Sequence, residues 1–227
     1  MAKLTKKLYT LGEEIFNSVS HGIGAGLSVA GLVIMVVFSA VQGDPWKVVS
    51  SAIFGASLII LYTMSTLYHS FTNPTAKKVF RIFDHSTIFI LIAGTYTPIT
   101  LVTMRSVNKG LAWTIFGILW GLTVIGIVLN SINLEKFKKI SLVCYVIMGW
   151  SIIMAVNPLI ISPIKNHTHF PIPLGGMLFL LIGGIFYTVG IIFYKMKSVK
   201  YMHSIWHLFT VAGSVFQFFA ILLYIIM

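Results

Sequence analysis

The sequence predicts an all-α integral membrane protein, a bundle of seven transmembrane helices with a cytoplasmic N-terminus and an extracellular C-terminus. Three observations predict this fold: an apolar composition, seven apolar runs of helical length, and an uneven distribution of basic residues. Of the 227 residues, 57% are apolar and only 9% are charged, whereas soluble domains carry about 25% charged residues. The mean hydropathy is +0.94. We therefore expect lipid to be the solvent for most of the surface.

The apolar runs divide the chain into candidate spans. A helix needs about 20 apolar residues to cross the hydrocarbon core of a bilayer. Seven stretches qualify, and the short segments between them contain Gly, Pro and Asn. We expect one membrane domain over residues 1–227, which begins with a short basic cytoplasmic segment at about 1–20. The expected spans are 22–41, 46–70, 86–104, 110–130, 140–156, 174–194 and 205–227.

The basic residues predict the orientation. Of the 16 lysines and arginines, twelve lie in the N-terminal tail and in the second, fourth and sixth connecting segments, and four lie on the opposite side. Cytoplasmic segments of membrane proteins are enriched in Lys and Arg, which places the N-terminus inside. The net charge of +11 is thus spread between spans. We expect membrane lipids as partners and no nucleic acid, and the sequence indicates no particular protein partner.

Three histidines form a candidate metal site. His203 and His207 lie four residues apart at the start of the last span, so their side chains project from one face of a helix. His69 ends the second span, and the predicted topology places it on the same side of the membrane. Three imidazoles bind a zinc ion and leave one position open for water. The alternative for such a pair is buried, hydrogen-bonded imidazoles without a metal.

Two further residues suggest hydrolytic chemistry. Ser65 lies one helical turn before His69, and Asp84 precedes the third span. Zinc lowers the pKa of its bound water to about 7, and Asp84 is positioned to hold or deprotonate that water. Ser65 can donate a hydrogen bond to the developing oxyanion, although serines in membrane helices also bond to carbonyls of their own helix. A site at the inner leaflet suits hydrolysis of a lipid amide or ester.

Polar residues ahead of the first span lie on the same predicted side. They are Glu14, Asn17 and His21. Glu14 and Asp84 are two of only five acidic residues in the chain, and both stand near histidines. We expect these three residues to lie close to the site, with His21 as a hydrogen-bonded structural histidine and not a ligand.

At these residues the chain resembles the hemolysin III family, the bacterial branch of the progestin and adipoQ receptor superfamily, which includes the adiponectin receptors. The resemblance implies a seven-helix fold with a cytoplasmic N-terminus, a zinc ion near the inner surface, His69, His203 and His207 as ligands, and Ser65 and Asp84 beside the zinc-bound water. Membrane hydrolases such as the alkaline ceramidases belong to the wider group, which favours lipid amide hydrolysis. The motifs are Glu14-x-x-Asn17-x-x-Ser20-His21-Gly22, Ser65-x-x-x-His69-Ser70, Asp84-His85 with Gly94-Thr95-Tyr96-Thr97-Pro98, and His203-Ser204-Ile205-Trp206-His207.

Two other functions remain open at this point. The family name implies a cytolytic, pore-forming protein, although a secreted pore former needs a soluble state and this apolar chain resides more easily in a membrane. A receptor-like sensor would use zinc only to hold helix ends together. Catalytic and structural zinc ligands look alike in a sequence, so the residues do not separate the hydrolase from the sensor. All three readings predict a multi-pass protein of the cell membrane.

Overall fold

The computed structural model describes residues 9–151 and 174–227. Within these two ranges the chain forms helices joined by turns, with no strand, as the all-α prediction requires. Lys3, Lys6, Lys7, Lys165 and the last residues of the fifth expected span, 152–156, lie outside the described residues.

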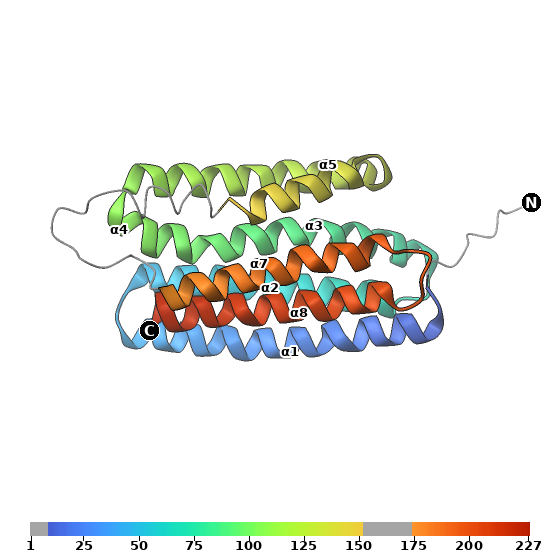
Figure 1. Ribbon diagram of the computed structural model, residues 1–227, viewed down its shortest axis with the longest axis horizontal. Coiled ribbons are helices and arrows are strands. Elements are labelled where there is room, and N and C mark those ends of the chain that lie inside the picture. Colours follow the sequence, from blue (N-terminus) through green and yellow to red (C-terminus); the bar gives the residue numbers. More distant parts are fainter. Residues whose placement is uncertain (1–8, 152–173) are drawn as a thin grey trace, which may run out of the picture.

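The long helices lie roughly side by side along one axis (Figure 1). A π-helical segment, η1, follows Pro98, because a proline lacks the N–H that an α-helical hydrogen bond requires. The elements are α1 Leu11–Val41, α2 Pro45–Ser70, α3 Pro74–Pro98, η1 Ile99–Met104, α4 Arg105–Val107, α5 Lys109–Gly149, α7 Leu174–Lys195, α8 Met202–Ile221 and η2 Leu222–Ile226.

Local sequence signals explain where the helices begin. The Asp44 side chain accepts hydrogen bonds from the backbone N–H groups of Trp46 and Lys47 at the start of α2. Asn73 caps α3 in the same way. In both helices the next residue is proline, which suits the first helical position because an N–H there has no intrahelical acceptor.

Two helices begin earlier than the apolar runs predict. Helix α1 begins at Leu11 and not at residue 22, so about half of the expected N-terminal segment forms its first turns. A capping box starts this helix: the backbone N–H of Thr10 donates to Glu13 Oε2 (2.7 Å), and Thr10 Oγ1 accepts from the N–H of Glu13 (3.4 Å). Helix α3 begins at Pro74, so Asp84 lies inside the helix. Hydropathy locates apolar residues, whereas these polar turns are fixed by caps and packing.

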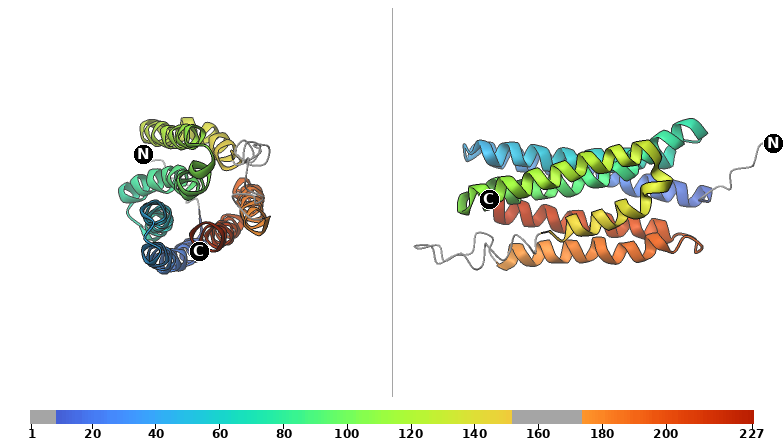
Figure 2. Two further views of the ribbon diagram at one scale, coloured as in Figure 1. Left: turned by 90° about the vertical axis from the view of Figure 1, so that its left-hand side faces the viewer. Right: turned by 90° about the horizontal axis from the view of Figure 1, so that it is seen from above.

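Helix α5 reverses direction within its length. Among the described residues six helices are long and apolar enough to cross a membrane, and α5 contains both the expected span 110–130 and residues 140–149 of the expected span 140–156. Asn133 has extended backbone angles (φ −161°, ψ 92°). The Ser141 hydroxyl donates to Asn130 Oδ1 over 2.7 Å, whereas a straight helix would separate residues eleven apart by about 16 Å. The second half of α5 therefore runs back beside the first (Figures 1 and 2).

The helices form an open ring. Around this ring they follow the order α5, α3, α2, α1, α8, α7, and each helix packs on the next (Figure 2). The ends of this series, α5 and α7, contact each other far less closely. The end of the bundle that holds the C-terminus of α2 and the N-termini of α1, α3 and α8 contains His69, His203 and His207. We call it the histidine end.

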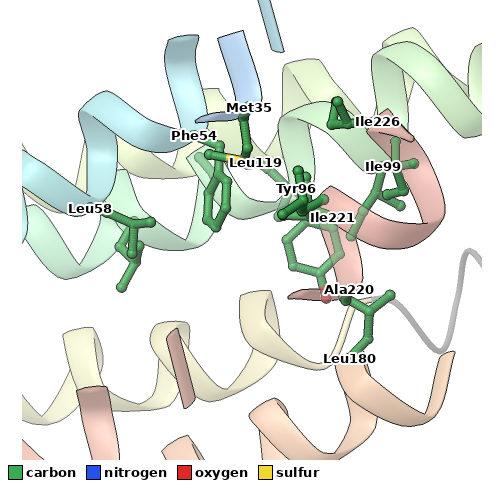
Figure 3. Close-up of a cluster of buried hydrophobic side chains, with 14 of the residues drawn as sticks. Met35, Phe54, Leu58, Tyr96, Ile99, Leu119, Leu180, Ala220, Ile221 and Ile226 are labelled. Carbon is green, nitrogen blue, oxygen red and sulfur yellow. The ribbon is translucent and has the colours of Figure 1, made fainter. Parts of the chain in front are cut away.

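The hydrophobic core lies toward the opposite end. Its buried side chains come from all the long helices and from η1 and η2, and Figure 3 shows part of this cluster. Close helix contact depends on glycine: a Cβ atom on Gly55 of α2 would lie 3.0 Å from the Cα of Leu32 in α1 and 2.7 Å from its Cβ. Small residues at such contacts let helix backbones approach in lipid, where packing contributes most of the attraction between helices.

Candidate metal centre and cavity

The three predicted histidines meet at the histidine end. His69 lies in the last turn of α2, and His203 and His207 lie in the first two turns of α8. One ring nitrogen from each lies within 4.8 Å of the others, and the Nε2 atoms of His203 and His207 are 3.1 Å apart. Ligands of a tetrahedral zinc ion, each about 2.0–2.1 Å from the metal, lie about 3.3 Å from one another. The spacing of the α8 pair therefore suits a shared metal ion.

Hydrogen bonds orient two of the imidazoles. His69 Nδ1 lies 2.7 Å from Glu14 Oε2, and His207 Nδ1 lies 3.2 Å from the backbone oxygen of Asn17. A ring that donates through Nδ1 keeps the lone pair of Nε2 free for a metal, and carboxylates or carbonyls commonly orient metal-binding histidines in this way. His69 Nε2 is buried and has no hydrogen-bond partner among the described residues. The donor set thus fits a metal ion.

The first turns of α1 fasten the histidine-bearing helices together. Asn17 is fully buried, and its Oδ1 accepts a 2.7 Å hydrogen bond from the Ser204 hydroxyl of α8. Glu13 Oε1 accepts from the backbone N–H of Tyr201 (2.8 Å), which has left-handed angles (φ 63°) just before α8. Glu14 also forms an ion pair with Lys77 of α3 at 2.7 Å. Glu14 and Asn17 therefore hydrogen-bond two of the three clustered histidines, His69 and His207.

His21 lies against the cluster in a way the sequence did not predict. Its ring stacks on His207 with 3.6 Å between centroids and 13° between planes. It also makes an edge contact with Tyr62 at 5.0 Å. His21 lines the cavity beside His203 and His207. Among the described residues its imidazole is held by ring contacts with His207 and Tyr62, and its expected structural hydrogen bond stays a prediction.

Ser65 and Asp84 line the same cavity as His203 and His207. The Ser65 side chain is 1% exposed, and its hydroxyl has no hydrogen-bond partner in the described part of the chain, so it does not bond to a carbonyl of its own helix. Asp84 lines the cavity from α3, with Oδ2 3.7 Å from His85 Nδ1. Both side chains, with His21, His203 and His207, line this one space. A carboxylate and a free hydroxyl are therefore available to a molecule bound beside the imidazoles.

The cavity is a long apolar space of about 400 Å³ between α3, α5, α7 and α8. This volume lies within the range of small-molecule sites, which are mainly apolar with a few placed polar groups. Its polar groups gather mostly at the histidine end. Apolar side chains line most of the remaining length, among them Ile88, Leu91, Ile92, Met177, Leu180, Leu181 and Ile191.

Tyr9 covers the candidate metal centre from outside the helices. Its ring stacks on His203 (centroids 4.8 Å apart) and makes an edge contact with His69 at 5.6 Å. Burial, reinforced by the charges of Tyr68 and Asp84, raises the pKa of Tyr9 above its ordinary value, so its hydroxyl stays protonated.

Sequence reasoning missed four residues of this site: Tyr9, Glu13, Lys77 and Ser204. Only Glu13 carried a readable signal, since Thr10 and Glu13 have the spacing of a capping box. The other three contact the site through tertiary packing between helices, which residue spacing does not reveal.

The fold and site define a class: a multi-pass helical membrane protein with three convergent imidazoles at one end of an apolar cavity. The model of the family described as Haemolysin-III related matches residues 9–218. The chain therefore belongs to this family, and its predicted membership and cell-membrane location are confirmed.

Relatives agree along nearly the whole chain. Hemolysin-3 from Bacillus cereus is 41% identical over 224 residues, which cover 99% of this chain and 97% of the relative. A Hemolysin-3 homolog from Bacillus subtilis (strain 168) is 41% identical over 217 residues, or 96% of both chains. Monocyte to macrophage differentiation factor from Homo sapiens is 26% identical over 223 residues, which cover 95% of this chain and 86% of the relative.

Proposed function

We propose that the protein is a zinc-dependent membrane hydrolase that cleaves an amide or ester bond in a lipid at the inner leaflet. One observation carries the proposal: three imidazole nitrogens converge at the end of an apolar cavity that also contains the unpartnered Ser65 hydroxyl and the Asp84 carboxylate. A merely structural arrangement needs neither the cavity nor the free hydroxyl.

The proposed topology has seven spans. Helix α5 supplies two of them, on either side of Asn133, and the histidine end faces the cytoplasm. The reversal within α5 and the concentration of basic residues between alternate spans support this orientation. The cavity entrance would then lie near the inner headgroups, where a lipid can enter between α5 and α7.

Each residue has a defined task in this proposal. His69, His203 and His207 would hold the zinc ion, which when bound polarises a carbonyl and acidifies water. Asp84 would accept a proton from the attacking water, and Ser65 would donate a hydrogen bond to the carbonyl oxygen as negative charge develops on it. The apolar cavity would hold the acyl chain, so that the scissile bond lies at the polar end. Hydrolysis would release a fatty acid and an amine or alcohol.

Asp84→Asn is the test of this function. The amide keeps nearly the same shape but no longer accepts a proton. We expect purified Asp84→Asn to retain the zinc content of the wild type and to lose lipid-amide hydrolysis, measured with long-chain N-acyl substrates in detergent. Equal turnover by the two proteins would contradict the proposal. Zinc binding without turnover of any lipid by the wild type would favour the structural-zinc sensor.

A second candidate function is cytolysis, which the names of the two Bacillus relatives favour. It predicts leakage of dye from liposomes that contain the purified protein, unaffected by chelators or by His69→Ala. The mainly apolar cavity lining favours a lipid chain over hydrated ions, so we rank this function second.

A further inference from the structure

Two cations share one carboxylate at the polar end of the cavity. Lys138 of α5 lines the cavity together with Asp84 and His85. Its ammonium group is paired with Glu135, one turn earlier. The same carboxylate accepts Arg81 of α3, with 2.6 Å between Nη2 and Oε1. Glu135 therefore compensates only one of the two positive charges.

A third cation joins this group from the turn between α7 and α8. Lys197 Nζ lies 5.4 Å from the ring centroid of Tyr194, which lines the cavity and contacts His203 at 6.0 Å between centroids. No carboxylate forms an ion pair with Lys197 in the part of the chain that the structure describes. Partial loss of hydration, together with the positive charges of Lys138 and Arg81, lowers the pKa of Lys197 below its ordinary value.

We infer that the molecule in the cavity is a lipid with a phosphorylated headgroup, whose phosphate is bound by Lys138 and Lys197 with Arg81 beside them. This inference deepens the proposed function and rests on it for the reaction, but not for binding.

Phosphate chemistry matches the arrangement better than a carboxylate does. A phosphate monoester carries a charge of about −1.5 to −2 at pH 7 and offers three strong acceptor oxygens. The three cations come from α3, α5 and the turn before α8: Lys138 lines the cavity itself, Arg81 shares the carboxylate of Glu135 with it, and Lys197 lies over the cavity-lining Tyr194. The apolar lining beyond them suits an acyl chain. Asp84 lies nearby, so an anion needs this excess of positive charge to bind there.

Binding to purified protein in an uncharged maltoside detergent tests the inference. The probes are oleoyl lysophosphatidate, monooleoylglycerol with the same chain but no phosphate, and inorganic phosphate. The variants are Lys138→Gln/Lys197→Gln and a matched control, Lys139→Gln/Lys195→Gln, which removes the same charge from neighbouring exposed lysines and keeps the cavity-lining Lys138. All proteins are treated with chelator, so that a metal ion cannot bind the phosphate.

We expect the wild type to bind lysophosphatidate at least about tenfold more tightly than monooleoylglycerol, since each charge-assisted hydrogen bond adds substantially to affinity. The Lys138/Lys197 variant should lose this preference, and the control should keep it. Equal binding of both lipids, or the same loss in the control, would overturn the inference. Competition by inorganic phosphate at lipid-like concentrations would also overturn the lipid assignment, in favour of a free-phosphate site.

Parallel measurements separate this inference from the proposed function. Zinc content and hydrolysis are measured on untreated samples of the same preparations. A zinc-containing, active enzyme without phosphate preference would defeat this inference alone. Phosphate preference in a protein that never binds zinc would defeat the hydrolase alone. Elution of each variant as a single species establishes that the Gln substitutions leave the fold intact.

Discussion

The two sides of the bundle differ in how tightly they pack. On the side of α1, α2 and α8, the Glu14 carboxylate and the Asn17 backbone oxygen accept hydrogen bonds from His69 and His207, and glycines bring the helix backbones together. On the side of α5 and α7, the helices surround a cavity. In the proposed function, the tightly packed side holds the histidines in place and the cavity on the other side binds the lipid. In lipid the hydrophobic effect does not drive helices together, so close helix association depends on van der Waals packing and polar contacts between them.

The largest expected effect comes from filling the tight side. In Gly55→Leu the new side chain would collide with Leu32, including its backbone Cα atom at 3.0 Å from the added Cβ. Overpacking of this kind lowers the free energy of unfolding by about 1–3 kcal/mol. We expect a value in the upper part of this range, because the backbone of Leu32 can shift less easily than a side chain. Thermal unfolding in detergent measures the loss. Unchanged stability would mean that α1 and α2 are not tightly packed.

Removing the carboxylate behind His69 should have the next largest effect. In Glu14→Ala, His69 Nδ1 loses its partner, and loss of such a partner typically lowers metal affinity by about 10–100-fold. Competition with a zinc chelator measures this change. Lys77→Ala is the matched control, because it removes the other ion pair of Glu14, together with the Lys77 hydrogen bonds to the backbone oxygens of Tyr68 and Phe71, but does not alter the two groups of the Glu14–His69 contact. If both variants lost affinity equally, the histidine contact would have no special role.

A smaller effect is expected from filling the open side. Gly184 lines the cavity, and a Cβ atom there would meet nothing closer than Trp150 at 4.0 Å. Gly184→Leu should therefore fold normally and keep its metal, but bind a fluorescent long-chain fatty acid about tenfold more weakly, a difference of about 1.4 kcal/mol. Gly26→Leu is the control, on an exposed face of α1 with no atom near the added Cβ. Equal binding by both variants would argue against a ligand in the cavity.

The sequence predicted what depends on local pattern. Apolar runs located the helices, and the i, i+4 spacing of His203 and His207, combined with the topology, identified the candidate ligands. The apolar runs placed a break between residues 130 and 140. No proline or glycine marks the position within this segment where the chain turns, which the structure places at Asn133. The helical turns before residue 22 were missed because hydropathy does not detect a polar helix.

The remaining features depend on contacts between distant residues. The bond between Glu14 and His69 joins positions 55 residues apart, and the stacking of His21 on His207 requires α1 to lie against α8. The cavity depends on the wider separation of α5 and α7, which no residue pattern records. The positions of the helices could therefore be predicted from the sequence. The contacts that orient the histidines, and the cavity beside them, could not.

X-ray absorption spectroscopy of the zinc-loaded wild type shows whether the three histidines bind one metal ion. We expect about one zinc ion per chain, with three nitrogen ligands at about 2.0–2.1 Å and one oxygen ligand, and loss of this spectrum in His207→Ala. A wild-type protein that binds no metal, or a zinc spectrum that His207→Ala leaves unchanged, would contradict this expectation.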